Sequence, residues 1–214
     1  DGRVTLTLPV GLPERAAREC AAEKAGWIRS HLEKHPQQVQ AGFGMVLPVD
    51  GQDRLVEPAT GRRILLDAGL IAVPGANPAR PLQRYLKELA RNRLAEASDF
   101  YAQRLGRSYA RLTLRDTRSR WGSCTADGAL MYSWRLILAP PAVLRYVAAH
   151  EVAHLQEMNH SAAFWNVVEQ IHGHYQTPRS WLREHGASLH RFRFDPPEND
   201  PADAPAATQP ADRA

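Results

Sequence analysis

The chain has 214 residues, which is enough for one large domain, or for one domain with a small lobe, and a sizeable core. Its 43% hydrophobic and 23% charged residues are typical of a globular protein, and no apolar run approaches the roughly 18 residues that cross a membrane. The net charge of +4 is mild and the arginines are scattered, which argues against a nucleic-acid interface. Two isolated cysteines indicate a reducing compartment, with the cytoplasm as the expected location, or simply no need for a disulfide.

The first 80 residues are predicted to form a strand-rich region with one helix. Alternating apolar residues at positions 4–8 predict a strand, and Pro13 begins a helical pattern that continues to about Lys34. Short apolar runs between residues 43 and 73 are separated by glycine-containing turns. These runs predict an antiparallel meander.

The next segment is predicted to be a long helix followed by a hairpin. Residues 81–105 carry a helical apolar stripe that Gly106 ends. Residues 111–116 alternate as a strand does, and an apolar run at 130–138 predicts a further strand that leads into the next helix. The Asp-Gly pair at 127–128 predicts the turn before that strand.

Residues 117–124 allow two interpretations. They could supply an exposed strand edge, the element with which many peptidases pair an extended substrate. Alternatively, Arg120 and Trp121 merely close the hairpin. The sequence favours neither interpretation.

An H-E-x-x-H motif stands in the helix that Pro140 and Pro141 precede. His150 and His154 project from one helical face, where two imidazoles can hold one Zn²⁺. Glu151 lies about 100° round the helix, in the position of a general base for a zinc-bound water. By composition, the motif arises by chance about 0.02 times in a chain of this kind.

The third metal ligand has two candidates. His160 follows His154 by six residues, and a turn at Asn159 would bring it back toward the metal. Glu169 in the next predicted helix is the alternative, and it is better explained as a surface residue. The predicted site is therefore one zinc per chain held by three histidines.

Two further helices are predicted before the chain loses its apolar periodicity. Ser161 is the expected N-cap of a helix that runs to His172, and Thr177 with Pro178 is expected to begin the last helix. The end of the chain is rich in Pro, Asp and Ala, which predicts a disordered tail. The predicted division is a strand-rich region at 1–80, a catalytic core at 81–192 and the tail at 193–214.

Four blocks of the sequence resemble the YgjP-like metallopeptidase family, bacterial metal-dependent hydrolases related to the SprT and WLM-type zincins. The blocks are residues 117–124, 133–136, 150–155 and 159–165. The resemblance implies an α+β fold with a minimal zincin-like core. In this core an antiparallel-rich mixed sheet packs on the H-E-x-x-H helix, and a strand-rich region precedes the core in the sequence. Members of the family usually have further strand sequence before the position of Asp1, so this chain is expected to lack its native beginning.

The residues and the resemblance together predict a zinc metallopeptidase that acts on a peptide or protein. His150, His154 and His160 are the expected ligands, and Glu151 is the expected base that takes a proton from the attacking water. Four residues are candidates for substrate or oxyanion contacts: Arg120, Trp121, Tyr132 and Tyr175.

Two other functions are compatible with the motif. The same metal and base could hydrolyse a non-peptide bond such as a nucleotide phosphoanhydride, because the motif specifies water activation and not the electrophile. The zinc could instead be structural, within a binding module. Structural zinc sites are usually closed by four protein ligands, so this function would require a fourth ligand such as Cys124 or His172.

Overall fold

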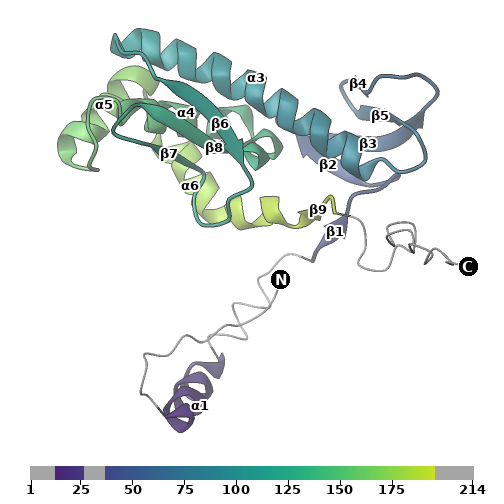
Figure 1. Ribbon diagram of the computed structural model, residues 1–214, viewed down its shortest axis with the longest axis horizontal. Coiled ribbons are helices and arrows are strands. Elements are labelled where there is room, and N and C mark those ends of the chain that lie inside the picture. The colour runs from purple at the N-terminus through teal and green to yellow at the C-terminus, as the bar shows by residue number, and fades with distance from the viewer. Residues whose placement is uncertain (1–12, 27–36, 196–214) are drawn as a thin grey trace, which may run out of the picture.

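The computed structural model describes residues 13–26 and 37–195 (Figure 1). The first element, α1 (Glu14–Glu23), follows Pro13 and confirms the start of the first predicted helix. Residues 27–34 of that prediction, and the strand predicted at 4–8, lie outside the described residues.

Four strands form the first sheet, in the order β2-β3-β5-β4. They are β2 (Val46–Val49), β3 (Gln52–Ala59), β4 (Leu65–Leu66) and β5 (Leu70–Pro74). Strands β2 and β3 are antiparallel, as are β4 and β5, but β3 and β5 are parallel. The predicted antiparallel meander is therefore wrong at its centre. A parallel pair needs a connection that returns the chain to the same end of the sheet. Residues 60–69 make that return, and β4 within them pairs with the outer edge of β5.

Helix α3 (Ala79–Leu105) is the longest described element and extends along the molecule from the first sheet to the second (Figure 1). Leu82, Leu86 and Leu94 on its apolar stripe are fully buried, and it packs on the helix that carries the motif. Gly106 ends it with φ +67°, a conformation that glycine adopts without strain. The predicted helix at 81–105 is confirmed. Among the described helices, none is both long and apolar enough to cross a membrane.

Three strands form the second sheet, in the order β6-β8-β7. They are β6 (Arg111–Arg115), β7 (Gly122–Cys124) and β8 (Ala129–Ser133). β7 and β8 form the predicted antiparallel hairpin, with a turn at Gly128 (φ +77°), whereas β6 pairs with β8 in parallel.

The strand predicted at residues 130–138 is too long. β8 stops at Ser133, and a 3₁₀ helix, η1 (Trp134–Leu138), takes its place. Every residue of η1 is buried. A run that is apolar on all sides has no periodicity by which a strand could be distinguished from a helix, which explains the error.

The remaining elements surround the motif. They are α4 (Pro141–Ala153), α5 (Ala162–His172), α6 (Gln176–His185), η2 (Gly186–His190) and β9 (Phe192–Arg193), which pairs in parallel with β1 (Val39–Gln40). Ser161 caps α5 with its side chain, as predicted. The start predicted for the last helix is two residues late, because Tyr175 and not Thr177 occupies the N-cap of α6.

One hydrophobic core joins the two sheets and the helices. It extends from Leu47 and Ile71 in the first sheet to Phe164 in α5 and Phe194 after β9. The predicted tail begins too early at residue 193, because Phe194 is only 2% exposed. The chain is thus an α+β protein with two mixed sheets, and the division at residue 80 stays a prediction.

Candidate active site

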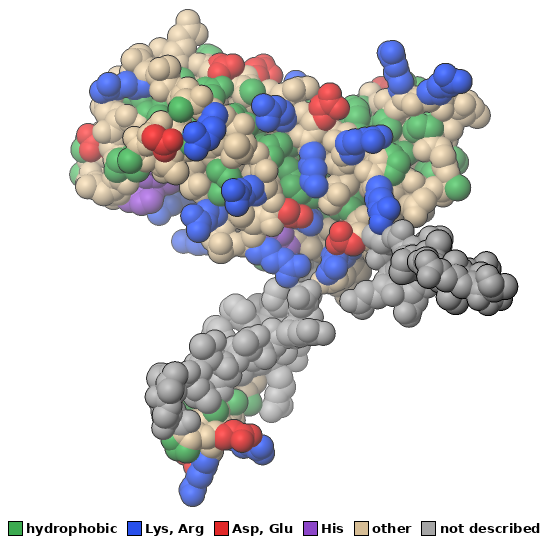
Figure 2. Space-filling view, in the orientation of Figure 1, with side chains coloured by type: hydrophobic (Ala, Val, Ile, Leu, Met, Phe, Trp, Pro, Cys, Tyr) green, Lys and Arg blue, Asp and Glu red, His purple; other side chains and the backbone are tan. Residues whose placement is uncertain are grey.

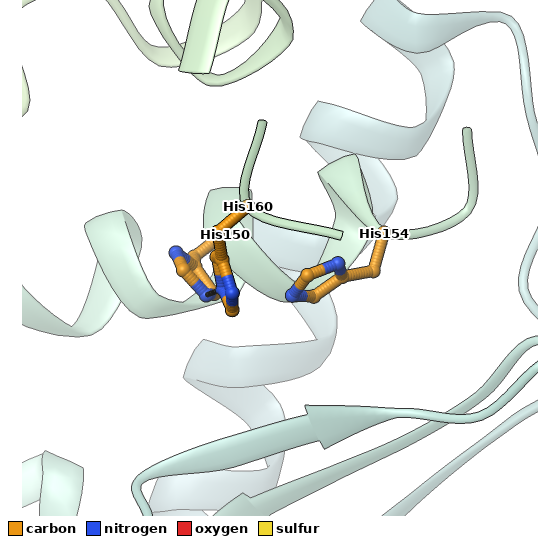
Figure 3. Close-up of side chains that lie close together, drawn as sticks. All are labelled: His150, His154 and His160. Carbon is orange, nitrogen blue, oxygen red and sulfur yellow. Dashed lines mark hydrogen bonds between the residues drawn. The ribbon is translucent and has the colours of Figure 1, made fainter. Parts of the chain in front are cut away.

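Three imidazoles converge at the end of α4 (Figure 3). His150 lies in α4, His154 is the residue that ends it, and His160 lies in the loop before α5. One nitrogen of each ring lies within 4.8 Å of the others, and the Nε2 atoms of His150 and His160 are 2.9 Å apart. The structure therefore brings together the three histidines predicted as metal ligands.

A tight reversal of the chain brings His160 back to the helix. The N–H groups of Gln156 and Glu157 both donate to the Ala153 carbonyl, which ends α4 in a narrow turn. Asn159 accepts a hydrogen bond from the Ser161 N–H through its side chain. The left-handed backbone expected at Asn159 is not found, since Asp50 is the one described non-glycine residue with positive φ.

A backbone contact and an aromatic floor orient the rings. His154 Nδ1 lies 2.9 Å from the Glu157 carbonyl oxygen, so it carries the proton and leaves Nε2 free as a lone-pair donor. The fully buried Phe164 contacts all three imidazoles, with ring centroids 4.5 to 4.8 Å away. The sequence predicted Phe164 only as a core residue, and its place just after the cap of α5 was the available signal.

The cluster fits a metal ion. Burial, then the neighbouring His154 and His160, lower the pKa of His150 to about 3, and burial lowers the pKa of His154. The rings of His150 and His154 are thus neutral at pH 7, the form in which imidazole binds metals. Nitrogens bound to one tetrahedral zinc lie roughly 3.3 Å apart. The Nε2 atoms of His150 and His160 are 2.9 Å apart, and no two ligand nitrogens of the cluster are more than 4.8 Å apart, so the observed distances span that separation.

No further ligand joins the cluster among the described residues. The group of metal-ligating side chains contains the three histidines alone, without Glu169, Cys124 or His172. This agrees with His160 as the third ligand. A structural zinc is usually closed by four protein ligands, and the described residues offer no fourth ligand, which disfavours that alternative.

Glu151 directly follows His150 in α4 and lies against β7. Its side chain is only 5% exposed, and burial raises its pKa to about 8. A Cβ atom added to Gly122 would lie 2.5 Å from the Glu151 Oε1 atom. Glycine is therefore required at position 122, because only a bare backbone can pass this close to the carboxyl group.

The four predicted substrate contacts lie in different environments. Tyr132 is fully buried, and its hydroxyl is 3.0 Å from that of Ser98, so the prediction that it meets substrate is wrong. Arg120 is exposed just before β7. Trp121 packs 5.2 Å from the His190 ring, and Tyr175 stacks on Trp165 at 5.0 Å.

Two residues that the sequence analysis passed over also lie near the cluster. Tyr146, one turn before His150, places its ring 6.0 Å from that imidazole, and its helical spacing was a usable signal. Arg179 holds its guanidinium 4.4 Å from the Trp165 ring. Nothing in the local sequence indicates this second contact, because the packing of α6 decides it.

A three-histidine cluster beside a buried glutamate on an H-E-x-x-H helix is the arrangement of a metal-dependent hydrolase. The YgjP-like metallopeptidase domain matches residues 1–185, so the chain belongs to the YgjP-like metallopeptidase family. This membership implies a divalent metal.

Comparisons with individual proteins add little. No curated protein matches the chain significantly. Among solved structures, the metallopeptidase zymogen abylysin of Pyrococcus abyssi matches at 17% identity and a TM-score of 0.40, over 46% of this chain and 97% of its own. A likeness this weak carries no information about function.

Proposed function

We propose that the chain is a zinc-dependent peptidase that cleaves an extended peptide beside β7. The observation that carries this proposal is the position of Glu151. Its buried carboxyl group lies against the backbone of the edge strand β7, and the residue directly before it in α4 is His150 of the three-histidine cluster. A base, a metal site and a surface for a peptide backbone thus meet at one point.

His150, His154 and His160 are the proposed zinc ligands. Three histidine ligands leave a fourth position open, as catalytic zinc sites do. When bound, zinc supplies a water of lowered pKa and a positive charge that polarises a carbonyl. The Glu157 carbonyl holds His154 in the tautomer that this role requires.

Glu151 is the proposed general base. A cation in the cluster would lower its pKa from the value set by burial, so the carboxylate form becomes available near neutral pH. The carboxylate accepts a proton from the attacking water and delivers it to the leaving amine. Burial excludes competing solvent from this transfer.

The free edge of β7 is the proposed binding surface for substrate. In the described part of the chain, β7 pairs with β8 on one side and with no strand on the other. An extended peptide can add to such an edge through main-chain hydrogen bonds. Arg120 at the start of β7, and Tyr175 across the cluster, remain the proposed contacts for substrate or for the oxyanion.

Metal analysis of the purified full chain tests the ligand set. The wild type should contain about one zinc per chain, and His160→Ala should lose most of it. His174→Ala is the matched control, because His174 is an exposed histidine outside the cluster. A well-folded wild type that takes up no metal from a zinc-containing buffer would contradict the site.

A substrate panel then tests the reaction. The zinc-loaded protein should cleave members of a quenched-peptide library and should leave nucleoside triphosphates intact. Glu151→Gln serves as the background for both. Turnover of the triphosphates alone, abolished by Glu151→Gln, would replace the peptidase with a phosphoanhydride hydrolase that uses the same site.

A further inference from the structure

A pocket of about 460 Å³ lies between β7 and α6, next to the candidate active site. Trp121 forms one wall, and this residue directly precedes the glycine that adjoins Glu151. Tyr146 forms another wall, and its ring is 6.0 Å from that of His150. A peptide lying along β7 would therefore place a side chain beside this pocket.

The pocket carries positive charge. Arg179 and Arg183 line it from successive turns of α6, together with Gln176, Ser180 and Leu182. No acidic residue lines it, and among the described residues no carboxylate forms an ion pair with either arginine. Figure 2 shows Lys and Arg side chains (blue) gathered beside the histidines (purple) along the lower edge of this face.

Other arginines of the chain have partners that these two lack. Arg135 bonds to Asp116 through two nitrogens, and Arg111 reaches Asp127. In the described part of the chain, the side-chain contact of Arg179 is with the Trp165 ring, over which its guanidinium lies at 4.4 Å. The stacking orients this guanidinium but leaves its hydrogen-bond donors available.

We infer that this pocket binds a carboxylate of the peptide substrate. Two guanidinium groups offer the paired donors that suit a carboxylate, and Gln176 and Ser180 add neutral donors. The Trp121 and Tyr146 rings would pack on the aliphatic stem of a glutamate. An apolar substrate side chain would instead leave two cations partly desolvated and unpaired. The carboxylate can come from an acidic side chain or from the C-terminus of the peptide.

The inference rests on the proposed peptidase function, so its experiment has a binding arm that does not require turnover. Zinc-loaded Glu151→Gln is titrated with peptides that carry Glu, Gln or Lys at each position near the cleavage site, each with a free or an amidated C-terminus. The Glu peptide should bind about tenfold or more tightly than the Gln peptide, as expected for a charge-assisted contact. A preference that follows the free terminus and not the side chain would assign the pocket to the C-terminal carboxylate.

Charge reversal then assigns the preference to the pocket. Arg183→Glu, added to the Glu151→Gln protein, should abolish the Glu preference and favour Lys, and Arg183→Gln should abolish it without reversal. Arg62→Glu is the matched control, because Arg62 is an exposed arginine in the distant loop between β3 and β4. It should leave the preference unchanged.

Three results would overturn the inference. One is equal binding of the Glu, Gln and Lys peptides with either terminus; the second is a Glu preference that survives Arg183→Glu. Tighter binding of a phosphoserine peptide than of the Glu peptide would also overturn the carboxylate assignment. A Glu preference that depends on Arg183, together with no cleavage by the wild type, would reject the peptidase function while the pocket assignment stands. In a cleaving wild type, the same preference should appear in kcat/KM.

Discussion

The two sheets have similar construction but very different surroundings. Each mixes parallel and antiparallel pairs and ends in a short edge strand, β4 in the first sheet and β7 in the second. The β4 edge presents Leu65, which is 63% exposed, with no described metal-ligating group nearby. The β7 edge lies against the buried carboxyl group of Glu151, which directly follows His150 of the histidine cluster. A strand edge thus gains a chemical role from the helix that packs beside it.

The largest effect is expected from the carboxyl group that distinguishes the two edges. Glu151→Gln should lower kcat by roughly 10²–10⁴-fold, the usual contribution of a general base. Zinc content should stay near that of the wild type, because Glu151 is not among the clustered ligands. Peptide hydrolysis and metal analysis on the same sample check both points. Retained hydrolysis would remove Glu151 from the proposed mechanism.

A glycine near each edge provides the sharpest test of the comparison. Gly122→Ala should push the Glu151 side chain away and lower kcat by about 10²-fold, as small misplacements of catalytic groups do. Gly61→Ala, beside β4, meets no atom within 4 Å and should leave kcat unchanged. Equal activity of both variants would show that the close approach at Gly122 has no catalytic consequence.

A buried arginine holds the second sheet to the end of the chain. Arg135 is 7% exposed, pairs with Asp116, and donates to the carbonyls of Leu189 and Phe192. Arg135→Ala removes these bonds and leaves their acceptors partly buried, so the free energy of unfolding should fall by about 3 kcal/mol.

The exposed pair on the same sheet is the control for Arg135. Arg111 and Asp127 are 63% and 62% exposed, so Arg111→Ala should change the free energy of unfolding by less than about 0.5 kcal/mol. Denaturant unfolding of the two variants measures the difference. A similar loss of unfolding free energy in both variants would mean that the burial of Arg135 does not strengthen its contribution to stability.

The smallest effect concerns pH, again beside the second sheet. Burial, then the nearby Arg135, lower the pKa of His190 to about 4, while Asp116 partly opposes them. An unfolded chain protonates this histidine below pH of about 6.5, whereas the folded chain resists protonation until about pH 4. Stability from this group is therefore present above pH 6.5 and is lost as the pH falls toward 4.

Melting temperatures between pH 4 and 8 measure this dependence. His190→Asn should flatten the acidic side of the curve relative to the wild type. His174→Asn, at an exposed histidine, is the control and should follow the wild type. An unchanged slope in His190→Asn would assign the acid sensitivity to other groups, such as Asp116. The pKa of Asp116 lies below its usual value, because the bonds to Arg135 outweigh the effect of burial.

Much of the site was predictable because its determinants are local. The four-residue spacing of His150 and His154 places both on one helical face whatever surrounds the helix. His160 needed only a short turn to reach them. The long helix at 81–105, the turn at Gly128 and the Ser161 cap are local features of the same kind, and each was predicted correctly.

Tertiary structure alone decided which distant segments meet. Local sequence patterns do not indicate which distant residues will be in contact. Three features depend on such contacts: the parallel pairing of β3 with β5, the contact of Gly122 with Glu151, and the pocket between Trp121 and α6. Tyr132 shows the same limit, because burial and a bond to Ser98 remove it from a site to which its sequence position seemed to assign it. The sequence by itself identified the proposed metal ligands and the proposed base, since helix geometry relates residues a few positions apart. The packing of the whole core determined what surrounds them, because that packing balances burial over all segments at once.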